Sequence, residues 1–217
     1  MKRRHLLQKG IVAAVAITLF PSRGWSLGGT SPDIGSSAPD FDLPGTNLLV
    51  PQQSRWSLAD WKGRWLVLYF YPRDFTSGCT IEAHGFQDSL ADFSGLNCDV
   101  AAISADSVED HESFCSSEDL GFTLLSDHDG EVSRNYGSWM APYSLRHTFL
   151  IDPNGILRQR WVAVRPSGHA QEVLDAITEL QLAACRGGAA RRELGDDVAR
   201  VQPEAHATRA ARQLHDD

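Results

Sequence analysis

Residues 65–82 read WLVLYFYPRDFTSGCTIE, and this stretch decides the fold. Trp65 to Tyr71 form a continuous apolar and aromatic run that ends at Pro72, a pattern typical of a strand buried on both faces. From Cys79 to Phe93, apolar side chains recur at helical spacing, which predicts an amphipathic helix. A buried strand therefore leads through a short loop into a helix, and Cys79 lies where that helix begins.

Strand and helix patterns alternate along the rest of the chain. They predict strands at 99–104, 122–125, 147–151 and 156–164, helices at 107–118, 129–136 and 168–182, and a tight turn at 152–155. This order predicts an α/β protein with a central mixed β-sheet flanked by helices. The segment 36–182 is expected to form the globular domain, and it is long enough to bury a core without disulfides or metals.

Composition and charge exclude several classes of protein. The 42% hydrophobic and 22% charged residues are ordinary for a soluble globular chain. The formal net charge of −8 argues against a nucleic-acid partner, because phosphate binding needs a basic surface. The four cysteines form no C-x-x-C pair and no paired zinc-ligand spacing, which argues against a disulfide scaffold or a zinc module.

The first 26 residues resemble an export signal. A basic head at Lys2–Arg4 precedes an apolar run from Gly10 to Phe20, and the small residues Gly24 and Ser26 follow where a cleavage site is expected. The paired arginines suit the twin-arginine route, and the general secretory route remains open. The apolar run is too short to cross a bilayer as a helix, although an uncleaved anchor remains the alternative.

Export predicts a destination such as the periplasm or thylakoid lumen, where protein disulfides persist. Once the signal is removed, no stable membrane association is expected. At the other end, residues 183–217 are rich in Ala and Arg and poor in large apolar side chains. Such a segment buries too little apolar area to offset its ordering entropy, which predicts a frayed helix followed by a disordered tail.

Cys79 is the strongest candidate for a catalytic residue. At a helix start, free backbone N–H groups and the positive end of the helix dipole favour an anion such as a thiolate, which is the nucleophilic form of cysteine. Thr76 lies three residues earlier, where its hydroxyl can hydrogen-bond the sulfur or an incoming oxygen. Pro72 supplies rigid apolar cover and has no N–H.

The pattern Pro72-x-x-x-Thr76-x-x-Cys79 resembles the active-site motif of the peroxiredoxins, and its flanks resemble the bacterioferritin-comigratory, or Q-type, subfamily. Shorter matches follow at 38–41, 124–127 and 146–152. The resemblance implies a thioredoxin fold that reduces hydrogen peroxide and organic hydroperoxides without a metal or an organic cofactor. Relatives of the Q type are often monomers, so a monomer is expected.

The resemblance also implies roles for two distant residues. It places Arg146 beside the sulfur of Cys79, where a cation stabilises the thiolate and polarises the peroxide bond; a solvated strand-end arginine is the alternative. Many Q-type proteins carry a resolving cysteine five residues after the first one, but here that position is His84. Other members carry it on the next helix, where Cys115 stands, which implies a Cys79–Cys115 disulfide reduced by a thioredoxin-like protein.

Other residues have plainer interpretations. Cys115 could instead be a half-buried helix residue of a one-cysteine enzyme. Cys98 is expected to be a buried small hydrophobe, Cys185 a thiol in the tail, and Arg73 a surface charge. His111 and Cys115 share a helix face as a possible metal pair, without further ligands nearby in sequence. Three aromatic residues could line the substrate approach or cover the sheet edge: Trp139, Tyr136 and Tyr143.

Two further functions compete with the peroxidase. An exported thioredoxin-like oxidoreductase would share the fold, but the chain has no C-x-x-C motif. A non-catalytic binding module would also share the fold, but it would not need Thr76, Cys79 and Arg146 together. The fold alone therefore does not select the function, whereas the site favours the peroxidase.

Overall fold

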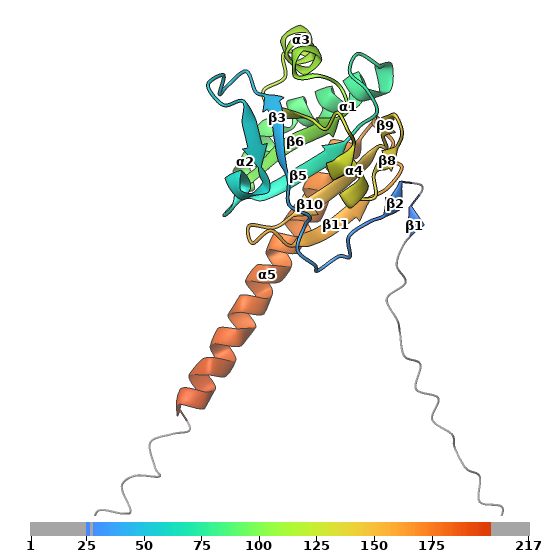
Figure 1. The fold of residues 1–217 in the computed structure, drawn as a ribbon. Coiled ribbons are helices and arrows are strands. Elements are labelled where there is room, and N and C mark those ends of the chain that lie inside the picture. The colour runs from blue at the N-terminus through green and yellow to red at the C-terminus, as the bar shows by residue number, and fades with distance from the viewer. Residues whose placement is uncertain (1–24, 27, 201–217) are drawn as a thin grey trace, which may run out of the picture.

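The computed structural model describes residues 25, 26 and 28–200 of the chain (Figure 1). Nearly all of the predicted export signal therefore lies outside the described residues, so the signal stays a prediction. The expected cleavage point after Ser26 falls between two short strands, β1 (Trp25–Ser26) and β2 (Gly29–Thr30), which pair antiparallel. No described helix is both long enough and apolar enough to cross a membrane.

A mixed sheet of seven strands forms the centre of the molecule, which confirms the predicted architecture. Three central strands run parallel, and the strands on either side of them pair antiparallel. The order across the sheet is β11 (Leu157–Trp161), β10 (His147–Ile151), β5 (Trp65–Phe70), β6 (Cys98–Ser104), β7 (Thr123–Ser126), β3 (Asp42–Thr46) and β4 (Arg55–Ser57).

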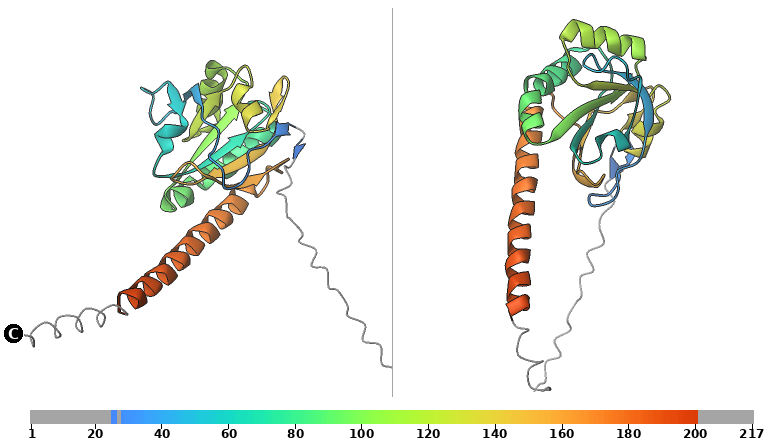
Figure 2. Two further views of the ribbon diagram at one scale, coloured as in Figure 1. Left: turned by 60° about the horizontal axis from the view of Figure 1, so that its bottom comes forward. Right: turned by 90° about the vertical axis from the view of Figure 1, so that its left-hand side faces the viewer.

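Helices cover both faces of this sheet. The described helices are α1 (Ser77–Asp88), α2 (Leu90–Gly95), α3 (Val108–Glu118), α4 (Glu131–Asn135) and α5 (His169–Arg200), with one 3-10 turn at Leu58–Trp61. In the right-hand view of Figure 2, α5 runs along one side of the sheet and the short α4 lies on the other. A small hairpin of β8 (Trp139–Met140) and β9 (Tyr143–Ser144) follows α4.

The β5 strand explains the continuous apolar run of the sequence. Its residues alternate between two buried clusters, because successive side chains of a strand point to opposite faces. Val67 and Tyr69 pack with the helices α1, α2, α3 and α5, whereas Leu66, Leu68 and Phe70 pack with the 3-10 turn and α4. All five are at most 2% exposed, so β5 is buried on both faces as predicted.

The helix predicted from Cys79 to Phe93 is in fact two helices, so that prediction is wrong in its continuity. The break lies at Ser89, whose backbone (φ −99°, ψ 2°) leaves the regular helical region. The Ser89 hydroxyl donates to the carbonyl of Gly85 at 2.9 Å, a backbone contact that often bends helices. The second short helix then buries Phe93 completely.

The last helix differs from the expected tail. The sequence predicts a regular helix to about Leu182 and a frayed helix beyond it, whereas α5 is continuous from His169 to Arg200. The helix extends further than burial alone predicts because Ala, Arg, Leu and Glu have high helix propensity and a helix satisfies its backbone hydrogen bonds internally. The tail prediction for 201–217 lies outside the described residues.

The sequence patterns also missed several short strands. β3 contains Pro44 and Gly45, which are rare in strand interiors and concealed it. Gly45 is needed there, since a Cβ at this position would lie 2.3 Å from the carbonyl oxygen of Leu124 on the neighbouring β7 strand. β4 and the strands of the two small hairpins are two or three residues long, too short for a periodic signal.

Candidate active site

Cys79 occupies the first turn of α1, directly behind the buried strand β5. Thr76 is the N-cap residue, and the first intrahelical bond runs from the Thr80 N–H to the Thr76 carbonyl at 2.9 Å. The N–H groups that precede this bond have no partner within the helix, as at every helix start. Cys79 is therefore held at the positive end of the helix, and its side chain is 2% exposed.

Arg146 reaches Cys79 from a distant part of the chain. It lies between β9 and β10, and its Nη2 donates to the sulfur of Cys79 at 3.2 Å. Burial by itself lowers the pKa of Arg146, but the negative charges of Glu82 and Cys79 outweigh burial and raise it. The guanidinium therefore stays protonated and places a fixed cation against the sulfur. This contact is the one that the family resemblance implied.

Glu82 holds the other side of the same guanidinium. Its Oε2 accepts a hydrogen bond from Nη1 of Arg146, while its Oε1 is buried without a hydrogen-bond partner. Burial raises the pKa of Glu82 to about 7, although Arg146 opposes this shift. Glu82 therefore titrates near neutral pH, and in its charged form it orients the guanidinium toward Cys79. No role for Glu82 is predicted from the sequence.

The loop before α1 supplies the remaining motif residues. Thr76 is exposed, and its hydroxyl donates to the carbonyl of Arg73 at 3.1 Å rather than to the sulfur. Its oxygen lone pairs are left to accept a hydrogen bond, for example from the O–H of a hydroperoxide. Pro72 is half-buried at the start of the loop. The exposed Arg73 lies 3.9 Å from Asp106, which confirms that it is a surface charge.

Cys115 lies on the same side of the sheet as Cys79. Both belong to one buried cluster, and Cys115 is 0% exposed in the second half of α3. Burial and the charge of Glu82 raise the pKa of Tyr69, and charges on Cys79 and Cys115 raise it further. Tyr69 belongs to the same buried cluster as both cysteines. The structure holds all four cysteines as free thiols.

The environment of Cys115 disfavours its thiolate. Burial and then the charges of Asp74 and Glu112 raise the pKa of this thiol to about 12. Cys98, at the start of β6, is similarly buried and has its pKa raised to about 12, as expected for a structural thiol. Cys185 is exposed on α5. None of these three thiols has the surroundings of Cys79.

His84 and His111 both make polar contacts that hold helix α1 or α3 in place. His84 is half-exposed on α1, and its Nε2 lies 2.8 Å from Glu118 at the end of α3. His111 does not form a metal pair with Cys115, since its ring nitrogens contact Asp74 and the carbonyl of Leu125. Among the described residues, no cluster of three metal-ligating side chains occurs.

The aromatic candidates divide between core and surface. Tyr136 is fully buried, packs against Phe70 and Phe149, and donates its hydroxyl to the carbonyl of Pro39 at 2.7 Å. Tyr136 is therefore a core residue and does not line an approach to Cys79. Trp139 is half-buried beneath Arg134, and Tyr143 is 44% exposed on the β8–β9 hairpin.

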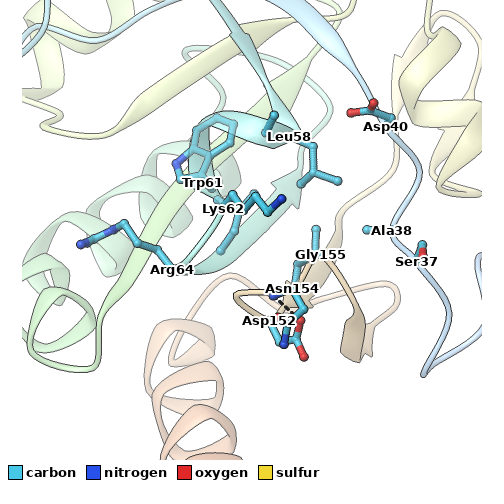
Figure 3. A pocket seen from close by; sticks show the side chains of 13 residues that line it. Ser37, Ala38, Asp40, Leu58, Trp61, Lys62, Arg64, Asp152, Asn154 and Gly155 are labelled. Carbon is cyan, nitrogen blue, oxygen red and sulfur yellow. Dashed lines mark hydrogen bonds between the residues drawn. The ribbon is translucent and has the colours of Figure 1, made fainter.

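A separate cavity lies at the opposite end of β5 from Cys79. Its volume is about 310 Å³, and Trp61, Lys62, Asp152 and Asn154 are among the residues that line it (Figure 3). Asp152 is already engaged, because it accepts hydrogen bonds from two backbone N–H groups and pairs with Arg158. None of the residues that line this cavity belongs to the buried cluster that contains Cys79 and Cys115.

Comparison with known proteins identifies similar chains. The family model described as "AhpC/TSA family" matches residues 34–160. A "Putative peroxiredoxin bcp" of Coxiella burnetii is 40% identical over 153 residues, which cover 67% of this chain and 98% of that one. A rat protein named "Thioredoxin-dependent peroxide reductase, mitochondrial" is 35% identical over 167 residues, which cover 72% of this chain and 64% of the rat protein.

Solved structures similar to this chain are also peroxiredoxins. A peroxiredoxin Q structure of Xanthomonas campestris matches with a TM-score of 0.59 and 32% identity, covering 64% of this chain and 90% of that chain. Two further structures of that protein are cysteine-to-serine variants, and the two replaced cysteines are 36 residues apart. Such neighbours show that the mixed sheet is a thioredoxin fold of the peroxiredoxin kind.

Proposed function

The chain belongs to the AhpC/TSA family and is a peroxiredoxin, and from this premise we propose that Cys79 is its peroxidatic cysteine. The observation that carries the proposal is the 3.2 Å contact between Nη2 of Arg146 and the sulfur of Cys79 at a helix start. Two positive influences therefore converge on one sulfur, and the thiolate is the form of cysteine that attacks a peroxide.

In the first step, the Cys79 thiolate attacks one oxygen of a hydroperoxide. A sulfur–oxygen bond forms, the oxygen–oxygen bond breaks, and an alcohol or water leaves after it takes up a proton. Arg146 is placed to stabilise negative charge on the leaving oxygen, and Thr76 to accept a hydrogen bond from the substrate O–H. Cys79 becomes a sulfenic acid.

In the second step, Cys115 resolves the sulfenic acid. Its thiol condenses with Cys79, a disulfide forms and water leaves. The shared buried cluster supports this role, and so does the spacing, because Cys79 and Cys115 are 36 residues apart, like the two replaced cysteines of the Xanthomonas campestris protein. An external thioredoxin-like dithiol then reduces the disulfide by exchange.

The burial of Cys115 supports a second candidate, a one-cysteine peroxidase. Cys115 is 0% exposed inside a regular helix, and a disulfide needs the two Cα atoms within about 7 Å in a suitable orientation. In a one-cysteine enzyme, an external thiol would reduce the Cys79 sulfenic acid directly. The two-cysteine cycle instead requires local unwinding of α1 and α3 after peroxide has reacted.

Peptide mapping by mass spectrometry after one equivalent of hydrogen peroxide distinguishes these candidates. The two-cysteine cycle predicts a Cys79–Cys115 linkage. Sulfenic or sulfinic acid at Cys79 with a reduced Cys115 would support the one-cysteine enzyme. An unmodified Cys79 would contradict both.

Export remains part of the proposal for this chain. It rests on the basic head and apolar run of residues 1–26, and it requires that the dithiol donor also lies outside the cytoplasm. A monomeric state is proposed with it. Mass spectrometry of the protein from its native cells tests export: a chain that begins after Ser26 supports it, and an intact Met1 in the cytoplasmic fraction contradicts it.

A further inference from the structure

A buried polar network joins the loop before α1 to helix α3. The Tyr71 hydroxyl donates to Oδ1 of Asp74 at 2.6 Å, and Oδ2 of Asp74 lies 2.7 Å from Nδ1 of His111. All three residues are at most 4% exposed. Nothing in the proposed chemistry of Cys79 uses them.

Every polar atom of the Asp74–His111 pair has a partner. Nε2 of His111 lies 3.2 Å from the carbonyl oxygen of Leu125, which only accepts, so this nitrogen carries a hydrogen. One further proton then lies between Nδ1 and the Asp74 carboxyl group. The backbone N–H of Asp74 donates to Asp106 at 2.9 Å, which fixes the loop itself. A fully satisfied buried network of this kind holds its two segments in one arrangement.

The two ends of the pair lie close in sequence to the two proposed reactive cysteines. Asp74 stands between Pro72 and Thr76, in the loop that leads into the helix of Cys79. His111 precedes Cys115 by one helical turn on α3. The pair therefore couples the conformation of the loop before Cys79 to that of the helix around Cys115.

An aromatic contact also joins the loop before α1 to helix α3. Phe75, next to Asp74, has a positive φ of 57° and a 55% exposed side chain. Its ring packs edge-on against Phe114, the residue before Cys115, with the centroids 5.1 Å apart. A non-glycine residue with this backbone conformation is strained, so the surrounding contacts hold it in place.

We propose that the Asp74–His111 pair is a latch that keeps α3 folded against the Cys79 loop and must open before Cys115 can reach Cys79. This inference rests on the proposed function of Cys115 as the resolving cysteine. The latch preserves the arrangement that reacts with peroxide, and its opening limits the rate of disulfide formation. Asp74 and His111 are positioning residues, because they act on the reacting sulfurs through the segments that carry them.

The latch sets the outcome of a competition at Cys79. The sulfenic acid either condenses with Cys115 and releases water, or it reduces a second hydroperoxide and becomes a sulfinic acid. A latch that opens more easily favours the disulfide. Weakening it should therefore accelerate resolution and protect Cys79 from overoxidation at the same peroxide concentration.

The test uses the full chain with His111→Gln, with Asp74→Asn and with both changes. Rapid quenching and mass spectrometry give separate rate constants for sulfenic acid formation and for the Cys79–Cys115 disulfide. We expect disulfide formation to accelerate about tenfold in each variant, with no further gain in the double variant, because one lost hydrogen bond of about 1.4 kcal/mol is a factor of ten. The fraction of sulfinic acid at high peroxide should fall in parallel.

Two control variants separate the latch from general loosening. Val173→Ala lowers the stability of the same buried cluster from α5, away from the junction. Glu118→Gln removes the partly exposed ion pair between α1 and α3 at His84. Both should change the disulfide rate less than about twofold, since a single ion pair that water reaches contributes little and α5 carries neither cysteine of the cycle.

The outcomes distinguish the latch from the proposed function. If the unsubstituted protein forms the disulfide and the His111 variant forms it at the same rate, the latch is refuted while the function of Cys115 stands. If Val173→Ala accelerates the disulfide equally, the effect is global and the latch is again refuted. If the unsubstituted protein forms no such disulfide, the resolving role fails, and the latch fails with it.

Discussion

Cys79 and Cys115 are almost equally buried, at 2% and 0% exposed, and they share one cluster under the sheet. Cys79 lies in the first turn of its helix with a guanidinium 3.2 Å from its sulfur. Cys115 lies in the second half of its helix, where burial and nearby carboxylates raise its pKa to about 12. The comparison teaches that helix position and charged neighbours, rather than exposure, decide which thiol is poised to react.

The largest expected difference between the two cysteines is in turnover. Cys79→Ser should reduce peroxide consumption to background, because no other described cysteine has a cation at hydrogen-bond distance from its sulfur. Cys115→Ser should still complete one oxidation of Cys79 and then stop in the presence of a dithiol donor. Peroxide consumption in single-turnover and steady-state assays measures both effects, with Cys98→Ser as the matched control. One full turnover by the Cys79 variant would remove the distinction.

Chemical labelling sharpens the comparison further. In the folded protein, iodoacetamide should modify Cys115 on the order of 1000-fold more slowly than in urea, because its thiol pKa lies about three units above the usual value. Its labelling rate should rise about tenfold per pH unit up to pH 10 without a plateau. Mass spectrometry of timed samples gives the rates. Labelling of Cys115 at the unfolded rate would show that α3 opens freely before peroxide reacts.

Removing the Arg146 guanidinium should make the Cys79 thiol less reactive toward peroxide, and in this respect more like Cys115. Arg146→Ala should slow sulfenic acid formation about 100-fold, the usual cost of losing one donor to a developing negative charge. The matched control is Arg165→Ala, which removes an exposed positive charge from the loop after β11. Stopped-flow measurements at several peroxide concentrations give the second-order rate constants. Equal rates in the two variants would show that Arg146 contributes only through net charge.

The smallest effect concerns Glu82, which orients Arg146. Burial raises its folded pKa from 4.5 to about 7, so between these values the folded state keeps a proton that the unfolded state has lost. This proton stabilises the fold fully below pH 4.5, and the contribution is lost as the pH rises through 7. The free energy of unfolding should therefore fall by on the order of 2 kcal/mol relative to Glu82→Gln between pH 4.5 and 8.

Urea denaturation of both proteins across this pH range measures the difference. The comparison with Glu82→Gln cancels the titration of groups common to both chains, such as the buried His147 and His169. A constant difference between the two proteins from pH 4.5 to 8 would mean that Glu82 is already ionised at low pH and that burial does not control it.

Much of the fold followed from local patterns because those patterns reflect burial on known faces. The apolar run at 65–71 favours a strand covered on both sides, and residues 65–70 form β5, one of the three central parallel strands. The break at Ser89 was missed, because it depends on a hydroxyl that bonds its own helix. The full extent of α5 did not follow from the apolar pattern, because helix propensity rather than burial favours its last turns.

The residues of the site also fall into two groups: those that a contiguous motif predicts and those whose role depends on distant contacts. The motif from Pro72 to Cys79 is contiguous, so its residues could be named from sequence, and the family resemblance added Arg146. Glu82 stood within the quoted stretch but gave no signal, since its role depends on a guanidinium that arrives from 64 residues away. His111 was considered as a metal ligand because its spacing from Cys115 suggested one. Its actual partner, Asp74, lies 37 residues away in sequence.

By itself, the sequence determined the order of the main strands and helices, the helix start that carries Cys79 and the family to which the chain belongs. These follow from periodicity and contiguous motifs, which need no knowledge of distant contacts. Only the tertiary structure decided which charges meet: Arg146 with Cys79 and Glu82, and Asp74 with His111. The physical reason is that burial and charge, which set reactivity, arise between segments that only folding brings together.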